Sequence, residues 1–454
     1  MRVSCSFGVI GMPGPTQAKL SALKALFGSV PDAALLTLER LLGDSGPSMT
    51  MVRDMVGQER ADRRLRDLVF GPVAPLFLSR ERGPCFPQSL GVAIWSALKT
   101  REPRLVADAM EQTRYHHADD PAPLVLDDLC VRAAQVLREG QTPLRARYGA
   151  MADDLAAYFD LASLARTALP HIPEWLGRVS EARSATLRIL LKDASALMPD
   201  GAPRLLELFL LHLPDPHLIL RIISVGTERA NDRYLDASEL SGFGQRLLDD
   251  VETRIEHVRT FDPNGPVDAA RGLGEDVSQV CAVLAEFERS VVLTRDGPWG
   301  LRVTAARRKL AANVESRLRD LESVMVQALP MRKVRVAGRM TRAAPCLDQE
   351  PNPRAVAHAQ GLFALLEATR ASAQVGGYGA LHAQVSDRLR ERLVDYADDV
   401  VLAINAGETP DEARARVFLE LAAEFLERAD DVKGAQLVRR RAAAAGAAQP
   451  SRVA

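Results

Sequence analysis

The chain has 454 residues, of which 47% are hydrophobic and 26% are charged, with a formal net charge of −1. These are the proportions of an ordinary soluble globular protein, and the near-zero charge excludes a global attraction to nucleic acid or anionic membranes. The length exceeds what one hydrophobic core usually supports, so we expect two to four structural units. Low aromatic content, 5%, and abundant Ala, Leu and Arg favour helices over sheets.

The N-terminal part contains the clearest strand pattern of the chain. Residues 2–10 alternate apolar and polar side chains, which is typical of a short strand. Helical patterns follow as far as residue 139, and Gly140–Pro143 is a turn-forming cluster. We therefore predict an N-terminal helical unit over 1–140, with one strand.

The next segment, 144–262, is predicted to be a unit of packed helices. Its most apolar region, Leu205–Val225, contains Pro214, Asp215 and Arg221 and so cannot span a bilayer. The five cysteines are widely scattered without a CxxC pair, which argues against a disulfide framework. No signal peptide is recognised at the N-terminus. By elimination, we expect a cytoplasmic protein.

Heptad-like apolar spacing characterises the second half of the chain. Helices are expected over about 267–293 and 299–329, as a long helical hairpin with a basic end in a unit over 267–342. On the first helix, apolar residues three and four apart predict a packing seam, against another part of the chain or a second copy. The seam consists of Val277, Val280, Leu284, Phe287 and Val291.

A C-terminal helical unit is predicted over 354–445, after a proline-rich linker at 343–353. Within this unit Gly407 should end one helix, and Thr409 should cap the next with Glu412 completing a capping box. No fixed repeat period emerges, so no helical-repeat family is assigned. The predicted fold class is predominantly all-α, an irregular multi-helical array with long helical hairpins and one short N-terminal strand.

The densest group of potential metal ligands lies just before Pro121 and comprises His116, His117, Asp119 and Asp120. Adjacent histidines point apart on a helix, so they could share a metal only in a loop. No HExxH motif or di-iron ExxH pair accompanies them. Such side chains at a helix end are more commonly solvated, and we predict no catalytic residues and no cofactor.

A basic segment is the strongest candidate for a binding surface. Residues 331–342 contain five cations and no acid: Arg332, Lys333, Arg335, Arg339 and Arg342. The segment 391–431 has the opposite bias, with twelve acids against four cations. The favoured interpretation is complementarity between these segments, within the chain or between subunits. An acidic protein partner, a nucleic acid or a lipid headgroup are the alternatives.

These patterns favour a non-enzymatic helical scaffold or adaptor that mediates protein–protein interaction, including self-association. One alternative is an enzyme whose site is assembled from dispersed residues, with a metal near His116 and His117. Another is a protein that binds anionic surfaces, of nucleic acid or lipid headgroups, through residues 331–342. Fold alone does not decide between these functions.

Overall fold

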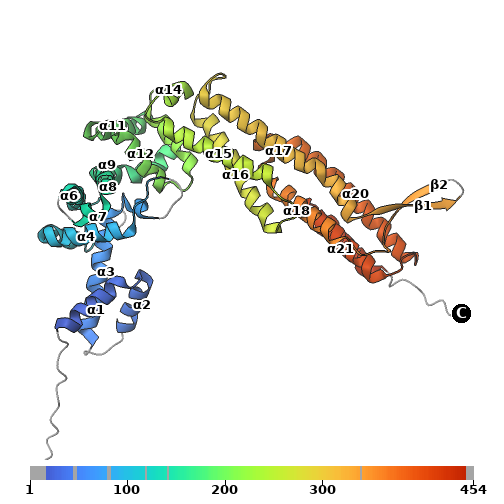
Figure 1. Ribbon diagram of the computed structural model, residues 1–454, viewed down its shortest axis with the longest axis horizontal. Helices are drawn as coiled ribbons and strands as arrows, with labels where there is room; N and C mark the ends of the chain where they lie inside the picture. Colours follow the sequence, from blue (N-terminus) through green and yellow to red (C-terminus); the bar gives the residue numbers. More distant parts are fainter. Residues whose placement is uncertain are drawn as a thin grey trace, which may run out of the picture. The chain divides into compact units, whose positions relative to one another are not determined.

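The computed structural model describes residues 17–43, 49–78, 83–117, 120–140, 143–337 and 340–445. Helices account for most of these residues, which confirms the predominantly all-α class (Figure 1). The strand predicted over residues 2–10 lies outside the described residues. Chain contacts define two compact units, unit 1 (Met1–Pro214) and unit 2 (Asp215–Ala454). Whether the four shorter segments delimited in the sequence fold independently stays a prediction.

Unit 1 is an array of short and medium helices. Their bounds are α1 Gln17–Ser29, α2 Asp32–Gly43, α3 Thr50–Phe70, α4 Gln88–Arg101, α5 Pro103–Gln112, α6 Val125–Arg138, α7 Pro143–Tyr148, α8 Ala150–Asp160, α9 Ala162–Ala168, α10 Ile172–Leu176, α11 Glu181–Leu197 and α12 Gly201–His212, with 3₁₀ turns η2 Ala74–Phe77 and η3 Leu169–His171. Proline occupies the first turn of α5, α10 and both 3₁₀ helices. Backbone N–H groups at the start of a helix have no partner within the helix, so the missing N–H of proline costs no hydrogen bond there.

The core of unit 1 has two parts along α3. The first half of α3 packs with α1 and α2 around Phe27, Leu35 and Val56. At the other end Phe70 makes edge-to-face contacts with Trp95 and Phe159, at ring-centroid distances of 5.9 and 5.1 Å. The helix α3 thus joins a small N-terminal three-helix cluster to the main core of the unit.

Unit 2 contains the long helices. Their bounds are η4 Pro216–Leu218, α13 Ile219–Gly226, α14 Asp232–Asp236, α15 Ser241–Thr260, α16 Val267–Ser290, α17 Pro298–Ala328, α18 Pro353–Thr369, α19 Ala373–Gly376, α20 Gly379–Asn405, α21 Glu412–Arg428 and α22 Val432–Ala444. The two helices predicted over about 267–293 and 299–329 are confirmed as α16 and α17, within three residues at each end.

Helix α16 packs mainly on α15 and α18 rather than on α17 alone, and α17 also contacts α15, α18 and α20. Trp299 at the start of α17 meets Phe287 of α16 edge-to-face, with ring centroids 5.7 Å apart. Farther along the unit, Phe363 of α18 stacks on Phe425 of α21, with ring centroids 4.4 Å apart. The apolar stripes of the long helices are therefore buried within unit 2.

The turn between α20 and α21 corrects one predicted cap. Gly407 adopts a left-handed conformation, with φ of +67°, directly after Ala406, the C-cap residue of α20, as expected for a helix-ending glycine. However, α21 begins at Glu412, and its cap is Asp411, whose carboxylate accepts from the backbone N–H groups of Ala413 and Arg414. The prediction of Thr409 as the capping residue was wrong by two positions.

A β-hairpin follows α17, where the sequence predicted no strand. The strands β1 (Met331–Ala337) and β2 (Met340–Pro345) pair antiparallel. The second strand occupies the first residues of the predicted linker, and α18 begins at Pro353, capped by Asn352. In Figure 1 the hairpin extends from the helical body of unit 2, beyond the labelled helices α17 and α20.

Candidate functional site

The hairpin β1–β2 carries the basic segment identified in the sequence, and its base is fixed to the helical body. Pro330 follows the end of α17, and its carbonyl accepts a hydrogen bond from the Cys346 N–H at 2.9 Å, which closes the two strands at their root. Leu329 and Leu347 on either side are buried, at 3% exposure each. An isolated two-stranded hairpin is marginally stable in water, so this anchored base stabilises it.

The register of the two strands sorts the cations onto opposite faces. Lys333 lies opposite Ala343, and Arg335 lies opposite Thr341. Since directly paired residues and residues two apart share a face, Lys333 and Arg335 form one basic face with small cross-strand neighbours. Arg332, Val334 and Arg342 belong to the other face.

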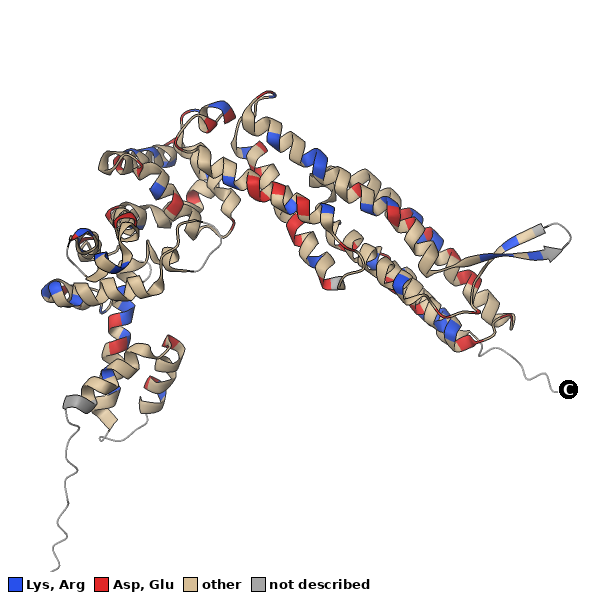
Figure 2. Ribbon diagram, in the orientation of Figure 1, with Lys and Arg blue, Asp and Glu red and all other residues tan. Residues whose placement is uncertain are grey.

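The cations of the two faces differ in their ion pairs. Arg332 lies 3.3 Å from Asp348, and Arg342 lies 3.9 Å from Glu408. Lys333 and Arg335 are exposed, and neither has an ion-pair partner among the described residues. Figure 2 shows the cations on both strands of the hairpin. Arg339, the fifth predicted binding residue, lies outside the described residues.

Sequence reasoning found these cations but missed the strands that carry them. The signal was present: Val334 and Val336 alternate with Lys333 and Arg335, and Gly338 follows. Alternating β-branched residues before a glycine are typical of a hairpin. The high cation content concealed this alternation, because the charged positions break the apolar pattern expected of a half-buried strand.

The acidic segment 391–431 pairs mainly with cations of the helices rather than with the hairpin. Only Glu408 makes an ion pair with a described hairpin residue, Arg342. Ion pairs to arginines of the helices or, for Asp430, to Arg370 at the C-cap of α18, are made by Asp398, Asp411, Glu412, Glu420, Glu424, Glu427 and Asp430. Asp431 caps α22 by accepting from the Gly434 N–H. Most of this acidity is therefore balanced locally.

Three acids of α20 have no ion-pair partner among the described residues: Glu391, Asp395 and Asp399. They are spaced four residues apart and so follow one another along the same side of the helix. Glu391 and Asp395 are exposed, whereas Asp399 is half-buried. This stretch of α20 therefore exposes two carboxylates that make no ion pair with the described residues.

The predicted metal ligands do not form a cluster among the described residues. Asp119 lies outside them, and no group of three or more His, Cys, Asp or Glu side chains elsewhere in those residues could hold a metal. The Asp120 carboxylate accepts from the backbone N–H of His117 at 2.9 Å. The carbonyl of His116 accepts from Arg64 at 2.9 Å. Both contacts are structural.

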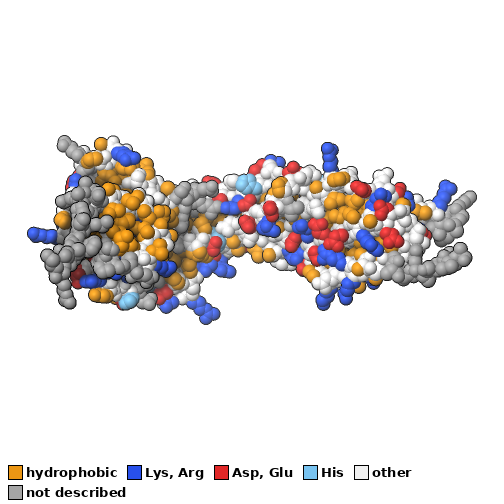
Figure 3. Space-filling view, turned by 90° about the horizontal axis from the view of Figure 1, so that it is seen from below, with side chains coloured by type: hydrophobic (Ala, Val, Ile, Leu, Met, Phe, Trp, Pro, Cys, Tyr) orange, Lys and Arg blue, Asp and Glu red, His pale blue; other side chains and the backbone are white. Residues whose placement is uncertain are grey.

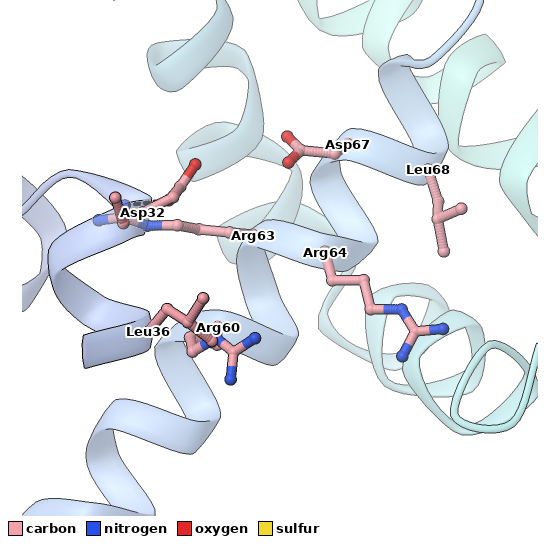
Figure 4. A pocket seen from close by; sticks show the side chains of 8 residues that line it. Asp32, Leu36, Arg60, Arg63, Arg64, Asp67 and Leu68 are labelled. Atoms are coloured by element: carbon pink, nitrogen blue, oxygen red, sulfur yellow. Dashed lines mark hydrogen bonds and ion pairs between the residues drawn. The ribbon is translucent and has the colours of Figure 1, made fainter. Parts of the chain in front are cut away.

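A groove of about 530 Å³ lies beside α3 in unit 1 (Figure 4). It is lined by Asp32, Ala33, Leu36, Arg60, Arg63, Arg64, Asp67 and Leu68. Its arginines are committed to internal contacts: Arg63 donates to Asp32 and to carbonyls at the end of α1, and Arg60 pairs with Glu39. In Figure 4 the Arg63 side chain extends toward Asp32. These cations hold α1 and α2 on α3.

The five predicted seam residues, four on α16 and Val291 at its C-cap, are all buried, with exposures of 4% or less. On the same helix, Glu286 is buried and receives two hydrogen bonds from Arg221, at 3.0 and 2.5 Å. Burial opposes ionisation of this carboxyl, but the hydrogen bonds from Arg221 and Ser290 outweigh it and hold its pKa below the ordinary value. The seam side of α16 therefore faces the interior of unit 2.

Nearby, His217 is 9% exposed, and its Nδ1 has no hydrogen-bond partner among the described residues. Burial lowers the pKa of this imidazole, against the raising effect of the carboxylates of Asp215 and Glu286. The nearby Arg221 cation also lowers the pKa of His217. His217 is therefore held neutral in the folded protein near neutral pH.

A buried carboxylate also ties two loops of unit 2 together. Asp232, fully buried at the start of α14, accepts from the Thr294 hydroxyl at 2.9 Å and from the Gly300 N–H at 3.2 Å. The backbone N–H groups of Thr294 and Arg233 donate to it as well. This carboxylate sits at the first turn of α17, where a helix N-terminus favours negative charge.

The cysteines of the described residues are free thiols. Burial raises the pKa of the Cys130 thiol to about 12 and that of Cys281 to about 11. Both thiols therefore stay protonated at neutral pH and have packing roles, because the thiolate is the nucleophilic form. Cys85 is exposed.

Comparison of the chain with protein-family models, with curated proteins and with solved structures finds no match. Within the described residues, every helix is too short or too polar to cross a membrane. On the face shown in Figure 3, cations and carboxylates are interspersed over the helical body of unit 2. The hairpin is thus the strongest candidate interaction surface of the described chain.

Proposed function

We propose that this protein is a helical scaffold that binds protein partners, with the hairpin β1–β2 as a contact surface. The observation that carries the proposal is the state of the hairpin cations. Lys333 and Arg335 stand exposed side by side on one face of the hairpin without an ion-pair partner in the described residues, whereas Arg221, Arg254 and Arg302 of the helical body are paired with carboxylates.

Two physical properties suit this hairpin to recognition. A two-stranded hairpin has an unpaired backbone edge on each strand, and such edges are templates for further pairing unless they are protected. Clustered charge accelerates the encounter with a partner of opposite sign and favours correct orientation. An acidic protein surface is therefore the partner chemistry that the hairpin fits best.

The test is a capture experiment with the full-length tagged chain and its native cell extract, at low and moderate salt. The bait is compared with a double charge-reversal variant, Lys333→Glu with Arg335→Glu. The matched control is Arg308→Glu with Lys309→Glu, which reverses one arginine and one lysine at exposed positions of α17. We expect a stoichiometric protein that the control retains and the hairpin variant loses.

Two results would count against the proposal. Equal capture by all three baits would remove the hairpin from the binding surface. Capture of nucleic acid, or of phosphatidylserine vesicles, in place of protein would instead support the alternative of an anionic-surface binder.

A further inference from the structure

Two surfaces of unit 2 carry opposite charges that the described residues leave unbalanced. One is the basic face of the hairpin, with Lys333 and Arg335, and the other is the exposed Glu391–Asp395 side of α20. Both are stable parts of the same unit, because β1–β2 is anchored at its base and α20 is buried along its opposite side by Val385, Leu389 and other residues. Their charges match in number and oppose in sign.

The spacing of the charges also matches. Two residues apart on a strand, Lys333 and Arg335 are separated by about 6.7 Å along the chain. Four residues apart on a helix, Glu391 and Asp395 are separated by about 6 Å along the axis. A strand laid along the helix therefore brings each cation next to one carboxylate at the same time.

The hairpin face is shaped to admit a helix. The cross-strand neighbours of Lys333 and Arg335 are the small residues Ala343 and Thr341. These leave a low surface beside the two long cationic side chains, so a helix can approach the strands closely. The third unpaired acid, Asp399, continues the acidic side of α20 by one more turn.

Among the described residues, Lys333 and Arg335 make no ion pair with Glu391 or Asp395 of the same chain. Strand β2 lies against α20 in the same unit, and the ion pair between the described hairpin residues and segment 391–431 is Arg342–Glu408, on the face opposite to Lys333 and Arg335. The charges of Lys333 and Arg335, and those of Glu391 and Asp395, therefore remain available to a second chain. A contact of this kind between chains joins two different patches. Two copies can therefore form two such contacts with each other, or each copy can contact a further copy in an open chain.

We infer that the hairpin of one copy docks through Lys333 and Arg335 onto Glu391 and Asp395 of α20 in a second copy. This inference rests on the proposed function of the hairpin as a protein contact surface, and it names the partner. The attraction is electrostatic between exposed groups, so salt weakens it: the screening length falls from about 10 Å at 0.1 M to about 3 Å at 1 M ionic strength.

The experiment measures the molar mass of the purified full-length chain in solution by sedimentation velocity, over a range of concentrations at both salt levels. We expect a mass above that of the monomer at low salt and a shift toward the monomer at high salt. The hairpin variant Lys333→Glu with Arg335→Glu should be monomeric at low salt. The helix variant Glu391→Lys with Asp395→Lys should be monomeric as well.

Mixing the two variants is the decisive step. The reversed hairpin of one variant now faces the reversed helix of the other, and the remaining native patches also complement each other. The mixture should regain the mass that each variant alone has lost, whereas the control Arg308→Glu with Lys309→Glu should associate like the unmodified chain. This rescue distinguishes direct pairing from a loss of folding.

Three outcomes would overturn the inference: a monomeric chain at every concentration, association that survives both reversals, or variants whose mixture stays monomeric. A monomeric chain that still captures a partner through its hairpin would reject self-association alone and leave the proposed scaffold function standing. A chain that is monomeric and that captures no partner through its hairpin would reject both proposals.

Discussion

The helical body of unit 2 and the hairpin that extends from it use their charged residues in opposite ways. In the body, Arg221 neutralises the buried Glu286, Arg254 pairs with Asp276, and Arg302 binds Asp249 at 2.6 Å. On the basic face of the hairpin, Lys333 and Arg335 have no such partner among the described residues. These charges of the body thus serve the architecture, whereas the two hairpin cations remain open to a partner.

This difference separates stability from binding. Substitutions in the body remove contacts that the folded unit needs, so they should change its free energy of unfolding. Substitutions on the exposed hairpin face remove nothing internal, so they should change association alone. Four predictions test this separation, beginning with the largest expected effect on stability.

The first prediction concerns the buried face of α16. Leu284 is 1% exposed, and Leu284→Asp both removes apolar packing and places a carboxyl in an apolar environment. We expect the free energy of unfolding to fall by about 3–5 kcal/mol, enough to unfold a marginal unit. Urea denaturation followed by circular dichroism measures the change.

The control on the same helix is Ser278→Asp, at an exposed position. It should change the free energy of unfolding by no more than about 0.5 kcal/mol. If Leu284→Asp changed the free energy of unfolding as little as this control does, Leu284 would not be buried.

The second prediction compares two glycines of α16 that are two residues apart. A Cβ atom at Gly274 would lie 2.6 Å from the Cβ of Ala368 in α18, whereas a Cβ at Gly272 would meet no atom within 4 Å. Gly274→Ala should therefore destabilise the fold by about 1–3 kcal/mol. Gly272→Ala should stabilise it by about 0.5–1 kcal/mol, because alanine favours the helix.

Thermal and urea unfolding of the two single variants measure this pair of effects. Opposite signs would support the close approach of α16 and α18, and stabilisation by both substitutions would show that the two helices lie farther apart.

The third prediction is a pH dependence that arises from His217. Because burial lowers the pKa of this imidazole in the folded state, the unfolded chain binds a proton first as the pH falls below about 6.5. Stability should therefore decrease from pH 7.5 toward more acidic pH, with a slope from this one proton of at most about 1.4 kcal/mol per pH unit.

His217→Leu removes the titrating group and its unpaired nitrogen. Its free energy of unfolding, measured in urea at several pH values, should depend less on pH between about 5.5 and 7.5 than that of the unmodified chain. Identical slopes would mean that His217 takes up its proton equally well in both states.

The fourth prediction is the smallest effect. Lys333→Glu with Arg335→Glu should leave the free energy of unfolding within about 0.5 kcal/mol of its original value, because exposed side chains without partners contribute little. The midpoint of urea unfolding provides the measurement. A large loss of stability would show that the hairpin cations belong to the body of unit 2 after all.

Prediction from the sequence succeeded where the signal was local and long. The apolar stripe from Val277 to Val291 gave α16 within three residues, because a helix that buries one face must repeat its apolar residues every three or four positions. The sequence did not decide which residue caps α21, since Thr409 and Asp411 are both capping residue types. Asp411 is used because α21 buries Ala415 and Phe418 from that starting point.

The hairpin shows why the candidate site could be found only in part. Its cations were evident from composition, but their division into two faces depends on the register of β1 against β2. A shift by one residue would move every side chain to the opposite face. The local sequence pattern did not specify that register.

The sequence alone determined the predominantly helical class, the places of the long helices and the presence of five cations at 331–342. The tertiary structure decided which group each stripe and each charge would meet. Arg221 binds Glu286 across 65 positions of the chain, whereas Lys333 meets no carboxylate among the described residues. Helices form through contacts a few residues apart, but ion pairs and packed faces depend on how distant segments come together.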